Sequence, residues 1–172
     1  MKKRIAFRTM GANSTHKWAM LRGLVTSLVV HERIVTTVAK AKEMQRLSEN
    51  MITTAKKTDK LHARRLINKF IYTKHAQAKL MHVLGPRYQF REGGYTRVMK
   101  LAKPKMKDKS DMAVIEYVDR PGEIRAARPP AAFQNLSLEE VMEKLGIKDE
   151  AVVLDGDDQV QEAVLVGKED KP

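Results

Sequence analysis

The side chains best suited to bind an anion are gathered in residues 85–100, "GPRYQFREGGYTRVMK". Three arginines stand close to a glycine pair in this stretch, with only Glu92 to balance them: Arg87, Arg91 and Arg97. A guanidinium group can grip a phosphate with two parallel N–H donors. These residue types therefore favour phosphate binding, and a solvated glycine turn flanked by surface arginines is the alternative interpretation.

The spacing predicts how this stretch presents its arginines. In an extended chain, Arg87 and Arg91 share one face, while the aromatic residues between them turn inward on the other. Gly93 and Gly94 have no Cβ, so they permit a turn with positive φ and the close approach of a phosphate. We therefore expect an extended arginine segment that leads into a glycine turn.

Four lysines alternate with other residues in the segment that follows: Lys103, Lys105, Lys107 and Lys109. If this segment is extended, alternate side chains lie on one face, about 6.6 Å apart. Such a row of charges suits the phosphate backbone of a nucleic acid. A flexible, solvated loop is the alternative interpretation.

No constellation of residues suited to catalysis or metal binding can be named. The chain has no cysteine, which excludes disulfides, thiol catalysis and cysteine-ligated zinc. His75 and His82 could share a helix face, but no carboxylate completes a metal set at ligand spacing. The glycines match neither the GxGxxG dinucleotide-binding motif nor a P-loop. We expect no enzyme activity, no cofactor, no metal and no small-molecule substrate.

Net charge identifies the class of partner. The 172-residue chain carries +12, and residues 1–128 hold 29 Lys or Arg against 10 Asp or Glu, a net charge of +19. Residues 129–172 hold 4 against 11, a net charge of −7. A body of such high charge repels itself unless a polyanion binds it. The longest apolar run, residues 24–30, is far too short to cross a bilayer, so we expect no membrane partner.

Hydrophobic periodicity predicts the elements that position these groups. Asp59 is a candidate N-cap, the pair Gly85-Pro86 is typical of a helix end, and Ser137 with Glu140 forms a capping-box pattern. The Pro- and Arg-containing stretch 120–130 is predicted to be an extended linker. The expected helices cover residues 16–30, 38–56, 60–72, 75–84 and 136–147, and the expected strands cover residues 33–37, 95–102 and 112–118.

Five motifs follow one another along about residues 10–120: "HKWAMLRGLVTSLVVHERIVTT", "AKAKEMQRLSENMITTAKK", "GPRY", "GGYTR" and "MAVIEYVDR". Together they resemble the bacterial-type large ribosomal subunit protein 17 family. The resemblance implies an α+β fold with helices packed on a small three-stranded mixed sheet, followed here by an extended C-terminal tail containing a short helix. It also implies that the protein is a structural constituent of the large ribosomal subunit. Such a protein would bind large-subunit rRNA near the polypeptide exit-tunnel side and support translation.

The resemblance further implies which side chains face rRNA. Carried over position by position, these are His16, Lys17, Arg22, His31, Thr36, Thr37, Lys40, Lys42, Arg87, Arg91, Gly93, Gly94, Tyr95, Thr96 and Arg97. The charge pattern adds four lysines, one on the basic face of the helix 38–56 and three in the alternating segment: Lys56, Lys103, Lys105 and Lys107.

The C-terminal part of the chain is expected to have a separate role. We divide the chain into an rRNA-binding core, residues 1–120, and a linker with an acidic extension, residues 121–172. The extension has no counterpart in a typical bacterial member and looks organellar, which favours a mitochondrial ribosome; the bacterial cytoplasm and the chloroplast are alternatives. Its charge predicts docking on neighbouring large-subunit proteins. The alternative function is a free-standing basic RNA-binding chaperone.

Overall fold

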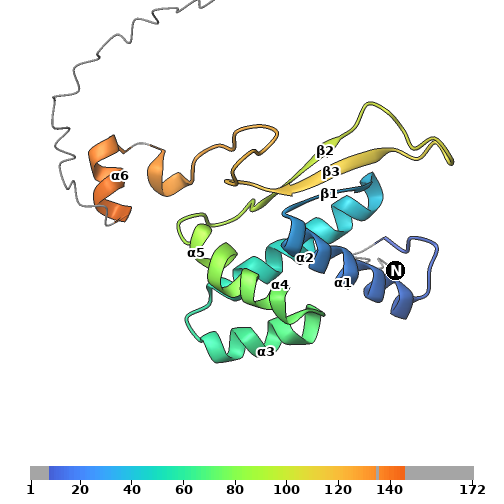
Figure 1. The fold of residues 1–172 in the computed structure, drawn as a ribbon, viewed down its shortest axis with the longest axis horizontal. Coiled ribbons are helices and arrows are strands. Elements are labelled where there is room, and N and C mark those ends of the chain that lie inside the picture. Colours follow the sequence, from blue (N-terminus) through green and yellow to red (C-terminus); the bar gives the residue numbers. More distant parts are fainter. Residues whose placement is uncertain (1–7, 135, 146–172) are drawn as a thin grey trace, which may run out of the picture. The chain divides into compact units, whose positions relative to one another are not determined.

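The chain forms a body of helices packed against a small sheet, in agreement with the predicted α+β class (Figure 1). The computed structural model describes residues 8–134 and 136–145. The described residues divide between two units, whose bounds are Met1–Asn135 and Leu136–Pro172. We call the first unit the body.

The elements of the body follow the predicted order closely. They are α1 (Ser14–His31), β1 (Arg33–Thr37), α2 (Val38–Lys56), α3 (Lys60–Phe70), α4 (Lys74–Lys79), the π-helical turn η1 (Leu80–Leu84), α5 (Gly85–Arg87), β2 (Thr96–Lys100), β3 (Met112–Tyr117) and the 3-10 turn η2 (Ala131–Phe133). The second unit contains α6 (Leu138–Leu145). The predicted strand 33–37 and helix 38–56 have the bounds observed for β1 and α2.

The three strands pair in the order β1-β3-β2, and both pairings are antiparallel. The expectation of a mixed sheet is therefore wrong. The loop after β2 turns the chain back, so that β3 runs antiparallel to β2 and separates it from β1. Both edge strands consequently run opposite to β3, and this three-stranded sheet is entirely antiparallel.

The central strand β3 carries opposite chemistry on its two faces. Ala113, Ile115 and Tyr117 are fully buried and belong to the same hydrophobic core as the inner residues of α1 and α2. Glu116 points to the other face, where the strand register places it between Arg33 of β1 and Arg97 of β2. Alternation along an antiparallel strand produces this division.

The pair Gly85-Pro86 does not end the fourth helix. The helical run continues from α4 through η1 and α5 to Arg87. Pro86 has no N–H donor, so it removes one bond of the helical ladder, and the run ends one residue later at Arg87. Gly85 is buried against α2: a Cβ there would lie 3.4 Å from the Leu80 carbonyl oxygen and 3.7 Å from that of Ala55. These are ordinary van der Waals separations, so the packing does not by itself require glycine at this position.

The predicted caps are confirmed. The Asp59 carboxylate accepts a hydrogen bond from the His62 N–H at 3.0 Å, at the start of α3. Before α6, the Ser137 N–H donates to the Glu140 carboxylate at 2.9 Å, and the Glu140 N–H donates to the Ser137 hydroxyl at 3.3 Å. The end predicted for this helix near residue 147 lies outside the described residues.

Candidate nucleic-acid interface

The stretch 85–100 folds around a buried tyrosine and is not an extended strand from Arg87 to Arg91. Tyr88 is fully buried, its ring centroid lies 5.2 Å from that of Tyr95, and its hydroxyl donates to the Val118 carbonyl at 2.5 Å. The residues after Arg87 therefore turn toward the core. The predicted alternation is wrong because α5 and this turn replace the extended chain, and Phe90 remains 36% exposed.

Each of the three arginines in this stretch has an internal partner. Arg87 donates to both oxygens of Glu32, at 2.8 and 3.4 Å. Arg91 donates to both oxygens of Asp119, at 2.8 and 2.9 Å. The Arg97 side chain donates to the carbonyls of residues 125 and 126 and lies 4.0 Å from the carboxylate of Glu116. These guanidinium groups hold distant segments of the body together.

Glu32 pairs with two basic side chains, Arg87 and Lys79. It lies just after α1 with a φ of 61°, and it receives Lys79 at 2.8 Å as well as Arg87. Burial by itself raises the pKa of Glu32, but the hydrogen bonds from Arg87 and Lys79 outweigh it and lower the pKa to about 2. The same ion pair raises the pKa of Arg87, despite the opposing effect of burial. The Glu32 carboxylate and the Arg87 guanidinium thus both remain ionised at neutral pH.

The glycine turn at Gly93 and Gly94 leads from Arg91 into β2. Gly94 has a φ of +63°, as predicted, whereas Gly93 does not adopt a positive φ. Lys56 of α2 spans the turn, because its amino group donates to the Arg91 carbonyl at 2.5 Å and to the Tyr95 hydroxyl at 3.2 Å. Tyr95 is only 2% exposed. The predicted site residues Lys56 and Tyr95 therefore shape the turn from within.

Two further predicted residues are committed to internal contacts. The Thr96 hydroxyl donates to the Glu49 carboxylate at 2.9 Å, and Thr96 is 6% exposed. Arg22 donates to the carbonyls of Phe70 at 2.9 Å and Lys69 at 2.7 Å, at the end of α3. Arg22 also lies over an aromatic ring, that of Tyr72, at 4.5 Å from its centroid.

The lysines between β2 and β3 lie on an exposed turn. The Lys105 N–H donates to the Ser110 carbonyl and the Lys109 N–H donates to the Lys105 carbonyl, both at 3.0 Å. The predicted extended row of lysines is therefore wrong, because a turn closes the hairpin in this segment. Asp108 lies in the same turn and its pKa is lowered, chiefly by the hydrogen bond from the Ser110 side chain. All four lysines are exposed.

A hollow at the start of α2 brings together predicted residues from distant parts of the chain. Thr37 and Lys40 line it from the β1–α2 junction, and Lys105 lines it from the hairpin turn. The hollow has a volume of about 510 Å³ and is also lined by Arg8. The Val38 N–H donates to the Asp111 carbonyl at 3.0 Å, which fixes the hairpin against the helix start. We call this feature the α2-start hollow.

The α2-start hollow is lined by charges of both signs, three basic side chains and two carboxylates. The N-terminal end of a helix carries partial positive charge from its free N–H groups, and α2 is 19 residues long. Lys40 and Lys105 add full charges, and the carboxylates of Asp108 and Asp111 also line the hollow. Asp108 is itself held by Lys105 at 3.4 Å.

The remaining predicted residues are spread over several surfaces of the body. They lie in the first turn of α1, at its end, on β1 and α2, in the glycine turn and in the hairpin loop: His16, Lys17, His31, Thr36, Lys42, Gly93, Lys103 and Lys107. Lys17 and Thr36 are half-buried and the others are exposed. The structure does not gather them into one pocket, which suits an extended ligand better than a compact one.

The main residue missed from the sequence is Glu116, which is fully buried between two strands. Arg33 donates to its carboxylate at 3.0 Å and to the Gly122 carbonyl at 2.6 Å. Together with Arg97, this cluster fixes the chain after β3 against the sheet. A cross-strand pattern of arginine, glutamate and arginine was the available signal, but it required the strand register.

The described residues contain neither a membrane-spanning helix nor a cluster of metal ligands. Within residues 8–134 and 136–145, no helix is both long and apolar enough to cross a bilayer. In the same residues, His, Asp and Glu side chains nowhere form a group of three or more that could hold a metal ion.

Comparison with known proteins places these features in a family. Residues 20–118 match the family described as Ribosomal protein L17. A protein of Schizosaccharomyces pombe, "Large ribosomal subunit protein bL17m", is 46% identical over 127 residues, which are 73% of this chain and 61% of that protein. The aligned region thus covers less than two thirds of the yeast protein.

Bacterial relatives are similar over a larger share of their length. "Large ribosomal subunit protein bL17" of Geobacter sulfurreducens is 40% identical over 146 residues, which are 84% of this chain and 82% of that protein. The protein of the same name from Borrelia turicatae is 42% identical over 120 residues, which are 70% of this chain and 95% of that protein.

The Geobacter sulfurreducens match corrects the prediction about residues 121–172. An alignment over 84% of a 172-residue chain must reach beyond residue 120. At least part of the extension therefore has a counterpart in a bacterial protein. The extension alone does not distinguish an organellar member from a bacterial one.

Proposed function

Because this chain belongs to the ribosomal protein L17 family, we propose that it is a structural constituent of the large ribosomal subunit. It binds large-subunit rRNA near the polypeptide exit-tunnel side and supports translation without catalysing a reaction. The family match over residues 20–118 carries this proposal. The net charge of +19 on residues 1–128 supports it, since an internal network of ion pairs cannot neutralise that excess.

The body binds RNA mainly through contacts with the sugar–phosphate backbone of the RNA. Lysine and arginine side chains displace the counterions condensed on the phosphates, which gives affinity that falls steeply with salt. The α2-start hollow adds a fixed position, because Lys40, Lys105 and the helix terminus can surround one phosphate group. Contacts of this kind recognise the shape of folded RNA rather than its base sequence.

The predicted site residues divide into two groups under this proposal. The accessible group contacts rRNA directly: His16, Lys17, His31, Thr36, Thr37, Lys40, Lys42, Gly93, Gly94, Lys103, Lys105 and Lys107. The second group shapes the surface through internal contacts: Arg22, Lys56, Arg87, Arg91, Tyr95, Thr96 and Arg97. The partly exposed edges of its arginines remain available to a phosphate.

The extension contacts neighbouring proteins in this account. Residues 129–172 have a net charge of −7, so rRNA phosphates repel them. The mitochondrial ribosome is the proposed location, supported by the yeast relative bL17m. Bacterial relatives are equally similar, and fractionation of the source cells distinguishes the two locations.

Site-specific cross-linking in assembled large subunits tests these assignments. A photoreactive side chain at position 40 or 105 should cross-link to large-subunit rRNA, and the same group at position 144 of α6 should cross-link to a protein. A free-standing RNA chaperone would instead cross-link to many RNAs outside the ribosome. Absence of large-subunit rRNA from the products at both positions 40 and 105 would contradict the proposal.

A further inference from the structure

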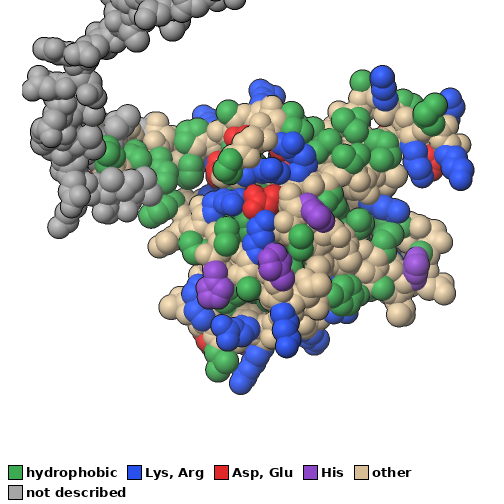
Figure 2. Space-filling view, viewed as in Figure 1, with side chains coloured by type: hydrophobic (Ala, Val, Ile, Leu, Met, Phe, Trp, Pro, Cys, Tyr) green, Lys and Arg blue, Asp and Glu red, His purple; other side chains and the backbone are tan. Residues whose placement is uncertain are grey.

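Helices α3 and α4 carry positive charge that the body does not balance. Residues 60–91 contain eight Lys or Arg and no Asp or Glu. Three of these basic residues pair with Glu32 or Asp119. Within the described part of the chain, no carboxylate lies within ion-pair distance of the other five: Lys60, Arg64, Arg65, Lys69 and Lys74. Basic side chains and histidines gather over this end of the body (Figure 2).

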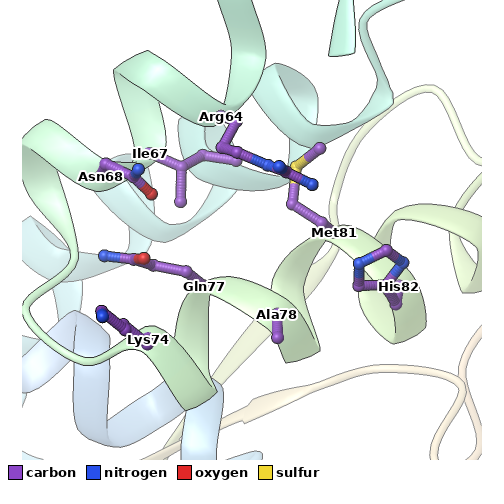
Figure 3. Close-up of a pocket in the computed structure, with 8 residues that line it drawn as sticks. All are labelled: Arg64, Ile67, Asn68, Lys74, Gln77, Ala78, Met81 and His82. Carbon is purple, nitrogen blue, oxygen red and sulfur yellow. The ribbon is translucent and has the colours of Figure 1, made fainter. Parts of the chain in front are cut away.

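Two of these unbalanced side chains line one groove. Arg64 of α3 and Lys74 of α4 border a pocket of about 260 Å³ between the two helices (Figure 3). Asn68 lies one turn beyond Arg64 on α3, and Gln77 and His82 line the opposite side. Arg64 and Asn68 are four positions apart on α3, and Lys74 and Gln77 are three positions apart on α4, so each pair faces one side of its helix.

Gln77 gives the groove a hydrogen-bond acceptor. Its amide nitrogen donates to the Ile71 carbonyl at 2.8 Å. This bond leaves the amide oxygen of Gln77 available to accept another hydrogen bond. The groove therefore combines cations for phosphate oxygens with an acceptor for a hydroxyl, such as the ribose 2′-OH that distinguishes RNA from DNA.

We propose that this α3–α4 groove binds the sugar–phosphate backbone of an RNA strand, as a contact separate from the α2-start hollow. The inference rests on the proposed function and adds a second contact surface to it. A protein partner would have to bring several carboxylates to this groove, whereas an RNA strand supplies a phosphate with every nucleotide.

The salt dependence of rRNA binding tests the groove. The variant Arg64→Ala/Lys74→Ala removes two phosphate contacts, so the slope of log affinity against log salt should become shallower by about 1.4–1.8. The variant Arg125→Ala/Arg128→Ala is the charge-matched control, because both side chains are exposed and lie outside the groove. A further variant, Asn68→Asp, places a negative charge in the groove at nearly constant size and should also weaken binding.

The outcomes separate this inference from the function on which it rests. Full-length protein and large-subunit rRNA are used throughout, and melting curves confirm that each variant is folded. If Arg64→Ala/Lys74→Ala and Asn68→Asp retain the slope and affinity of the Arg125→Ala/Arg128→Ala control, the groove inference is overturned while the proposed function stands. If large subunits carrying Arg64→Ala/Lys74→Ala instead lose a neighbouring protein, with rRNA binding unchanged, the groove is a protein contact and the RNA assignment is wrong. Failure of the wild-type protein to bind rRNA overturns the proposed function itself.

Discussion

Replacement of Glu32 by glutamine should destabilise the body in a pH-dependent way. Glu32 accepts from Arg87 at 2.8 Å and contacts Lys79 at the same distance, and its side chain is 14% exposed. The Glu32→Gln variant keeps the shape of the side chain but removes the charge that both cations face. It therefore weakens the connection between the end of α1 and the α4–α5 run.

The lowered pKa of Glu32 sets the size of the effect. The difference between about 2 in the folded chain and the ordinary value of 4.5 corresponds to at most about 3 kcal/mol. Solvent screening of a partly accessible ion pair reduces this to about 1–2 kcal/mol. Because the pKa is lowered on folding, this stability is present above pH 4.5 and is lost as the pH falls toward 2.

Thermal or urea unfolding between pH 7 and pH 3 measures this difference. At pH 7 the Glu32→Gln variant should melt below the wild type by about 2–4 °C for each kcal/mol lost. This difference in melting temperature should become smaller below pH 4.5. Glu92→Gln is the matched control, because Glu92 is exposed and no ion pair of the described residues includes it. The reasoning is refuted if Glu32→Gln behaves like Glu92→Gln at pH 7, or if the gap stays constant down to pH 3.

Three further changes test other parts of the structure. Gly94→Ala places a side chain at a φ of +63° and should cost about 1 kcal/mol in urea unfolding; an unchanged midpoint would show that the turn does not need glycine. Tyr88→Phe leaves the buried Val118 carbonyl without its donor and should cost about 1–3 kcal/mol, whereas a neutral result would show that another donor replaces it. Deletion of residues 136–172 removes a net charge of −7 and should leave rRNA affinity equal or slightly higher; loss of binding in a filter assay would refute the separate role of the extension.

Local sequence signals predicted the elements of the fold well. The β-branched run 33–37 and the apolar stripe of residues 38–56 define β1 and α2, because each pattern is complete within its own segment. Asp59 was identified as a cap for the same reason. Where the prediction failed, at residues 88–91 and 103–109, a buried tyrosine and a closing turn overrode an alternating pattern.

The partners of the predicted site residues could not be found in the same way. Glu32 and Arg87 are 55 positions apart, and Arg91 and Asp119 are 28 positions apart. No periodic pattern relates residues at such separations. The pairs form only when the end of α1 and the segment after β3 meet the residues of and after α5 in the folded body. The sequence therefore identified the arginines as important, whereas the structure shows that internal carboxylates already engage them.

Sedimentation of ribosomal subunits after a high-salt wash tests the central claim most directly. A structural constituent of the large subunit remains with that subunit, because shaped contacts with folded rRNA and with neighbouring proteins persist when exposed charges are screened. We predict that the chain migrates with the large subunit in about equal amount to its other proteins. Release of the chain to the top of the gradient, with intact large subunits left behind, would contradict this account and favour a free-standing RNA chaperone.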